Sequence, residues 1–140
     1  MKYAVVFNWD EKISKYQVSV PDLPGCSVSA ETIDIGMDDV TKAIKSHLEI
    51  LAEYGEKIPS GLSLETHRKS FMLEHPHTFS QAFWAIIKID ITPYLGKSHK
   101  INVTLPELLI TQIDDRVNKS SDYKTRSGFI ASACLAELAK

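Results

Sequence analysis

The stretch Lys100-Ile101-Asn102-Val103-Thr104-Leu105-Pro106 alternates polar and apolar residues and then stops at a proline. A β-strand has a side-chain period of two, so the three apolar residues point to one face and Lys100, Asn102 and Thr104 point to the other. Pro106 cannot extend a paired strand but suits the first turn of a helix. The stretch therefore predicts a short strand with a polar face, followed directly by a helix.

Two helices are predicted after this strand. In the range 107–118, apolar residues stand four apart and form one buried seam, which consists of Leu109, Ile113 and Val117. A turn follows at 119–122, and Thr125 can cap a final apolar-rich helix. One short strand and two helices are the element order of a ribbon-helix-helix (β-α-α) module, here over residues 96–140.

A segment of this size buries too little apolar surface to fold alone, so we expect the module to dimerise. Each subunit would contribute one strand to an antiparallel ribbon. The alternative is that residues 101–105 form an edge strand of an N-terminal sheet, with both helices packed on it.

The polar face of such a ribbon predicts a DNA contact, because a two-stranded ribbon fits the major groove of B-DNA. By resemblance to ribbon-helix-helix repressors, Lys100, Asn102 and Thr104 are expected to read base edges. The start of the last helix offers free N–H groups and a cation to phosphate, from Thr125, Arg126 and Ser127.

Residues 1–95 predict a β-β-β-α-β domain. Strands are expected at 3–9, 13–20, 26–30 and 83–91, and a long helix is expected from Thr32 or Asp34 to about Tyr54. The buried stripe of that helix is Met37, Val40, Ile44, Leu48 and Leu51. A short helix is expected at 64–72, and residues 94–99 form the linker.

Charge and hydropathy narrow the function classes. Residues 1–95 carry nine Lys and Arg against thirteen Asp and Glu, whereas residues 96–140 carry seven against five. The basic C-terminal third suits nucleic acid.

No apolar run approaches the ~20 residues that span a bilayer, and the N-terminus does not read as a secretory signal, so we expect a cytoplasmic protein. Cys26 and Cys134 are expected to be reduced core thiols.

Two stretches carry a family resemblance: Tyr16-Gln17-Val18-Ser19-Val20-Pro21-Asp22-Leu23-Pro24-Gly25-Cys26, and the helix end at 47–55 with Glu56-Lys57-Ile58-Pro59 after it. Over about residues 3–62 the chain resembles HicB-type antitoxins, for which a ribbon-helix-helix C-terminus is one known ending. Ala30 departs from the family, which commonly has Gly there. So does Ile35-Gly36-Met37, which replaces a more acidic, alanine-rich helix start.

The resemblance implies a degenerate RNase-H-like domain that binds and masks a small HicA-like toxin, an mRNA-cleaving enzyme. It also implies that the C-terminal module represses the operon. The acidic charge of residues 1–95 suits a basic, RNA-binding partner.

An active nuclease of this fold needs several carboxylates that converge on divalent metal ions. The N-terminal candidates lie in turns, in loops or near the start of a helix; they are Asp10, Asp22, Glu31, Asp34, Asp38 and Asp39. Asp22 is expected to cap its own turn. His75 and His77 lack an evident third ligand and read as a polar loop. We therefore expect no catalytic residues, no metal site and no cofactor.

The resulting hypothesis is an α+β antitoxin and autorepressor. Residues 1–95 bind a HicA-like toxin, and residues 96–140 dimerise and bind operator DNA in the major groove. No membrane partner is expected, and further association of the N-terminal domains is left open. The alternative is a stand-alone transcription regulator whose N-terminal domain senses a small ligand.

Overall fold

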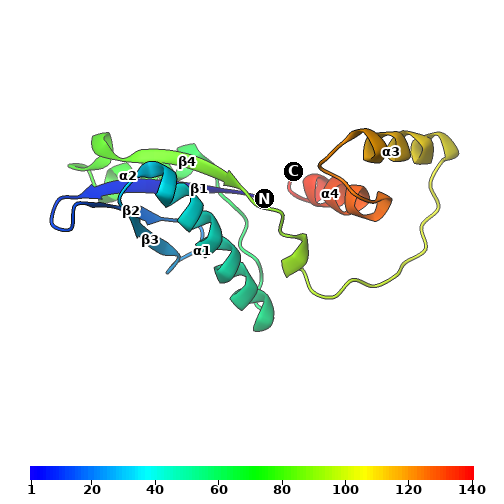
Figure 1. The fold of residues 1–140 in the computed structure, drawn as a ribbon, viewed down its shortest axis with the longest axis horizontal. Coiled ribbons are helices and arrows are strands. Elements are labelled where there is room, and N and C mark those ends of the chain that lie inside the picture. The colour runs from blue at the N-terminus through cyan, green and yellow to red at the C-terminus, as the bar shows by residue number, and fades with distance from the viewer. The chain divides into compact units, whose positions relative to one another are not determined.

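The computed structural model describes all 140 residues and divides them into two compact units, Met1–Gly96 and Lys97–Lys140 (Figure 1). The division lies one residue from the expected boundary. The class is mixed α+β, with one four-stranded antiparallel sheet and four α-helices. None of the four α-helices combines the length and the apolar character of a membrane-spanning segment.

The sheet of the first unit has the order β3-β2-β1-β4. Its strands are β1 (Lys2–Asp10), β2 (Lys15–Ser19), β3 (Ser27–Ala30) and β4 (Phe83–Lys88), and each falls where a strand is predicted. Five successive residues of β1, numbers 3–7, are buried. Because alternate side chains of a strand point to opposite faces, the centre of this sheet must be covered on both faces.

Helix α1 (Ile33–Glu53) covers one face. Thr32 caps it, and its hydroxyl accepts a hydrogen bond from the Ile35 N–H at 3.2 Å. Three residues of the predicted stripe are fully buried, namely Val40, Ile44 and Leu48. The outer two, Met37 and Leu51, are half-buried, so the helix touches the sheet most closely along its middle.

Gly36 marks the closest approach of α1 to the sheet. A Cβ atom at this position would lie 2.6 Å from Cε2 of Phe7 and 3.3 Å from Cγ2 of Val18. A side chain there would overlap the core. The glycine that departs from the family's usual helix start is therefore a packing requirement of this chain.

Helix α2 (Leu64–Glu74), predicted as 64–72, lies on the opposite face of the sheet. Phe71 of α2 packs edge-on against Trp84 of β4, with ring centroids 5.5 Å apart. Of the two neighbouring aromatics on β4, Phe83 is the one more open to solvent, at 45 %. Two short 3-10 helices, η1 (Phe79–Gln81) and η2 (Thr92–Tyr94), flank β4.

The second unit contains α3 (Glu107–Lys119) and α4 (Arg126–Leu138), as predicted. Thr125 caps α4, and its hydroxyl accepts a hydrogen bond from the Gly128 N–H at 3.0 Å. Of the predicted α3 seam only Ile113 is buried. Cys134 was expected in the core but is exposed, whereas Cys26 is buried, and burial raises the pKa of its thiol.

The predicted strand at residues 100–105 is absent from the single chain. These residues belong to no sheet and form no part of the four-stranded sheet either, so the edge-strand alternative is wrong. A strand is defined by its hydrogen-bonded neighbour, and a ribbon strand finds that neighbour only in a second copy. The ribbon therefore stays a prediction about the assembled protein.

Candidate functional site

Part of the sheet is left open on the face opposite α1. Phe7, Val18 and Ala30 lie against Gly36 of α1, so the residues that alternate with them point away from α1. Cross-strand partners form two polar rows on this side. The rows, together called the open sheet face, are Asn8, Gln17 and Ser29, then Ser19 and Ser27.

The open sheet face is neutral and rich in hydrogen-bonding groups. The hydroxyl of Ser29 donates to Oε1 of Gln17 at 2.9 Å, and Gln17, Ser27 and Ser29 are exposed. Asn8 and Ser19 are half-buried, so the side chains most accessible on this face are those of β3 and of Gln17.

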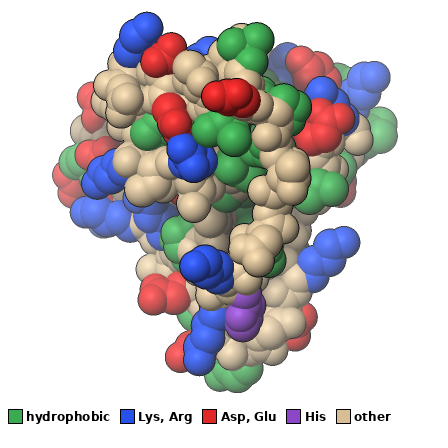
Figure 2. Space-filling model, turned by 90° about the vertical axis from the view of Figure 1, so that its right-hand side faces the viewer, with side chains coloured by type: hydrophobic (Ala, Val, Ile, Leu, Met, Phe, Trp, Pro, Cys, Tyr) green, Lys and Arg blue, Asp and Glu red, His purple; other side chains and the backbone are tan.

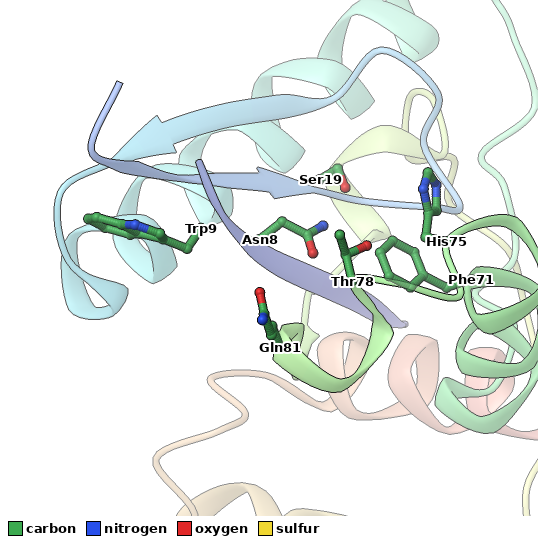
Figure 3. A pocket seen from close by; sticks show the side chains of 7 residues that line it. All are labelled: Asn8, Trp9, Ser19, Phe71, His75, Thr78 and Gln81. Carbon is green, nitrogen blue, oxygen red and sulfur yellow. The ribbon is translucent and has the colours of Figure 1, made fainter. Parts of the chain in front are cut away.

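A pocket of about 310 Å³ lies where the open sheet face meets α2 and the segment after it (Figure 3). Its polar lining is Asn8, Ser19, His75, Thr78 and Gln81, and its aromatic ring is that of Phe71. Trp9 borders the pocket, but its side chain points away from the pocket and its ring packs on Tyr16. Figure 3 shows the Asn8 side chain pointing toward Thr78, with Gln81 below and Phe71 beside His75. The rings of Phe71 and His75 have centroids 4.5 Å apart.

Asn8 is the unusual residue of this pocket. It interrupts the apolar run of β1, and its Oδ1 is buried without a hydrogen-bond partner in the protein. An unsatisfied buried acceptor is destabilising by about 1–3 kcal/mol. Sequence reasoning missed Asn8 as a site residue, although a polar residue inside an apolar central strand was the available signal.

Asp22 connects the Pro21-Asp22-Leu23-Pro24-Gly25 loop to α2. The prediction that Asp22 caps its own turn is wrong. Its Oδ1 accepts from the Leu62 N–H at 3.1 Å and lies 2.9 Å from Nε2 of His67, and both side chains are nearly buried. The loop is instead closed by its own backbone, including Cys26 N–H to Leu23 O at 2.9 Å.

The negative charge of Asp22 also acts on β1. Burial, and secondly the charge of Asp22, raise the pKa of Tyr3 to about 12. The Tyr3 hydroxyl donates to the carbonyl of Pro59 at 2.8 Å. Asp22 thus helps to hold the segment after α1 against the sheet, which is a structural role, and sequence alone gave no sign of its partner His67.

The other carboxylates considered for catalysis do not converge. Asp10 accepts from the Lys12 N–H in the first hairpin at 3.0 Å, and Asp34 and Asp38 are exposed on α1. Nowhere do three or more His, Cys, Asp or Glu side chains come together as a metal site would require. His75 belongs to the pocket described above.

The residues predicted to contact DNA lie in the second unit. Lys100, Asn102 and Thr104 are all exposed before α3, and Thr125 and Ser127 are exposed at the start of α4. Arg126 is engaged within the unit. Its Nε and Nη2 donate to the two carboxylate oxygens of Asp114 at 2.9 and 2.7 Å, which joins α4 to α3.

Large apolar side chains of the second unit are open to solvent. Ile101 is 77 % exposed and Val103 64 %, and Leu108, Leu109 and Leu138 are also exposed. Figure 2 views the molecule from the side where α3 lies in Figure 1 and shows hydrophobic side chains at the surface among charged ones. Exposed apolar side chains in this number are a reason to look for an interface in this unit.

Comparison with known proteins identifies the class. The family described as "HicB_like antitoxin of bacterial toxin-antitoxin system" matches residues 3–134. The chain therefore belongs to the HicB-like antitoxin family. It is also 33 % identical over 122 residues to an uncharacterized 14.9 kDa protein from the rep-hol intergenic region of Haemophilus phage HP1, which covers 86 % of this chain and 87 % of that protein.

Solved structures support the same grouping. The antitoxin HicB of Burkholderia pseudomallei is 33 % identical, with a TM-score of 0.69 over 99 % of this chain and 98 % of that one. A chain of the HicA3 and HicB3 toxin-antitoxin complex, at 19 % identity, shares the fold with a TM-score of 0.52 over 64 % of this chain and 99 % of its own length.

Proposed function

We propose that this chain is an antitoxin with two tasks. Residues 1–96 bind and neutralise a HicA-like, mRNA-cleaving toxin. Residues 97–140 form a homodimer that binds operator DNA in the cytoplasm and represses the operon. The observation that carries the proposal is a family match that spans both units, residues 3–134.

The first unit supplies a surface for the toxin. Its net charge is acidic, with thirteen Asp and Glu against nine Lys and Arg, which favours association with a basic RNA-binding protein. The open sheet face offers neutral hydrogen-bonding groups at its centre. A related fold, HicB3, was solved in a complex with the toxin HicA3.

The second unit supports the dimer. Only Ile113 is buried among its 44 residues, and the apolar side chains of Ile101 and Val103 have nothing to cover them in one chain. Pairing residues 100–105 of two copies would bury these side chains and turn Lys100, Asn102 and Thr104 outward. A twofold-symmetric DNA-binding dimer of this kind predicts a palindromic operator.

The antitoxin task is tested by co-expression of this chain with the small open reading frame beside it. We expect the neighbour alone to halt growth, and this chain to restore growth and co-purify with it. A harmless neighbour that does not co-purify would contradict the proposal and favour the ligand-sensing regulator, whose DNA affinity would change with a metabolite.

The DNA task is tested by three matched variants. Asn102→Ala should lose the preference for operator over random DNA while the dimer persists. Arg126→Ala should weaken binding to all sequences and reduce the salt dependence. Asp114→Asn is the control, because it removes the ion pair of Arg126 but keeps the cation. Unchanged discrimination in Asn102→Ala would refute the ribbon.

A further inference from the structure

The pocket of Figure 3 holds acceptors that the protein itself leaves unused. Oδ1 of Asn8 is buried and unpaired, and the side-chain oxygens of Ser19, Thr78 and Gln81 line the same space. None of the lining residues is a Lys, Arg, Asp or Glu. A ligand that brings several hydrogen-bond donors would therefore find neutral oxygens to accept them, first among them Oδ1 of Asn8.

One side of the pocket is aromatic. The ring of Phe71 lies against His75, with centroids 4.5 Å apart and planes inclined by 37°. A planar cation gains from contact with such rings. The site therefore combines oxygens that accept hydrogen bonds with a surface for stacking.

A guanidinium group meets both requirements. It carries five N–H donors and no acceptor, it is planar and it is weakly hydrated, so it loses less on leaving water than an ammonium does. We infer that this pocket binds an arginine side chain of the toxin. The inference rests on the proposed function and adds to it the chemistry of one central contact.

The partner's own chemistry supports this choice. A protein that cleaves mRNA needs cations for phosphate, and arginine is the residue that binds phosphate in a bidentate manner. The acidic charge of residues 1–96 favours the approach of such a surface. An arginine held in the pocket is withheld from RNA, so the contact would contribute directly to neutralisation.

The test adds charge of either sign at the same position. The probe is the toxin, the small basic protein encoded beside this chain. Asn8→Asp is nearly isosteric and should tighten toxin binding by about tenfold. Asn8→Lys should weaken toxin binding by about a hundredfold. Dissociation constants of the full-length proteins measure both effects. Ser46→Asp and Ser46→Lys are the controls, since Ser46 is exposed on the far side of α1.

A variant at a second position keeps the test valid if the Asn8 variants do not fold. Gln81 is exposed, so Gln81→Lys should fold normally and still weaken toxin binding. Replacing toxin arginines one at a time by glutamine should identify one whose loss removes the gain from Asn8→Asp. If wild-type chain binds no toxin, the proposed function fails. If it binds but Asn8→Asp, Asn8→Lys and Gln81→Lys all behave like the Ser46 controls, only the arginine pocket is wrong.

Discussion

The two units differ in how much of their apolar surface they cover. The first contains seventeen of the eighteen buried hydrophobic residues, and the second contains only Ile113. Both contain helices with proper caps, at Thr32 and Thr125. Capped local structure therefore does not by itself cover apolar surface, and the exposed apolar side chains of the second unit are what the proposed dimer would bury.

The largest effect is expected from substitutions in the exposed segment 100–105, which the proposed dimer would bury. Ile101→Lys combined with Val103→Lys places four unpaired charges in a dimer interface, and each buried unpaired charge is destabilising by several kcal/mol. We expect the dissociation constant of the dimer, measured by sedimentation, to rise by roughly a hundredfold or more. Tyr54→Lys is the control in the first unit, because Tyr54 is equally open, at 78 %. A dimer that survives the double substitution would contradict the inference that the exposed apolar side chains of the second unit form its interface.

A core substitution in the first unit should act independently of protein concentration. Leu48→Ala removes a fully buried side chain between α1 and the sheet, so we expect a loss of about 2–5 kcal/mol in the free energy of unfolding. Urea titration at several protein concentrations measures it. The matched control, Leu73→Ala, changes an exposed leucine and should stay within about 0.5 kcal/mol.

Gly36 tests how closely the first unit is packed. Gly36→Ala gains about 1 kcal/mol in helix propensity but forces a methyl group to within 2.6 Å of Phe7. Because overpacking is destabilising by about 1–3 kcal/mol, we expect a net loss of stability. Thermal unfolding checks this against Ser46→Ala, an exposed position on the same helix. A stabilised Gly36→Ala would show that the helix can move away from the sheet.

The smallest effect is expected at the ion pair of the second unit. The hydrogen bond from Arg126, together with its charge, lowers the pKa of the Asp114 carboxyl. The pair therefore stabilises the unit above the ordinary pKa of aspartate, and this contribution is lost as the pH falls through the lowered value. Amide exchange in α3 and α4 should rise slightly on acidification. Asp114→Asn should remove that pH dependence.

Much of the first unit could be predicted because its pattern is local. Continuous apolar runs marked β1 and β4, and apolar alternation marked β2 and β3. The steps from Val40 to Leu48 marked the buried face of α1. The pairing of distant segments could not be predicted in this way. Asp22 meets His67, and Phe71 meets Trp84, only because α2 folds back onto the sheet.

The candidate site also contains residues that a local pattern singled out and residues that only the fold brings together. Lys100, Asn102 and Thr104 are exposed, but Ile101 and Val103 between them are exposed as well. Exposure in one chain therefore does not test the predicted alternation, and the role of these residues toward DNA stays a prediction. The pocket around Asn8 brings together β1, β2 and the segment after α2, which are far apart in the chain. No motif joins these residues.

The sequence by itself determined the order of the four strands and four helices, the cap at Thr125 and the family, since each depends on residues close together in the chain or on short motifs. The tertiary structure alone decided which faces remain open, where Asn8 is left without a partner, and that Arg126 binds Asp114. These features depend on distances between segments that the chain's local preferences do not fix. The same reason explains why residues 100–105 show the pattern of a strand but form none in the single chain, so that the ribbon stays a prediction.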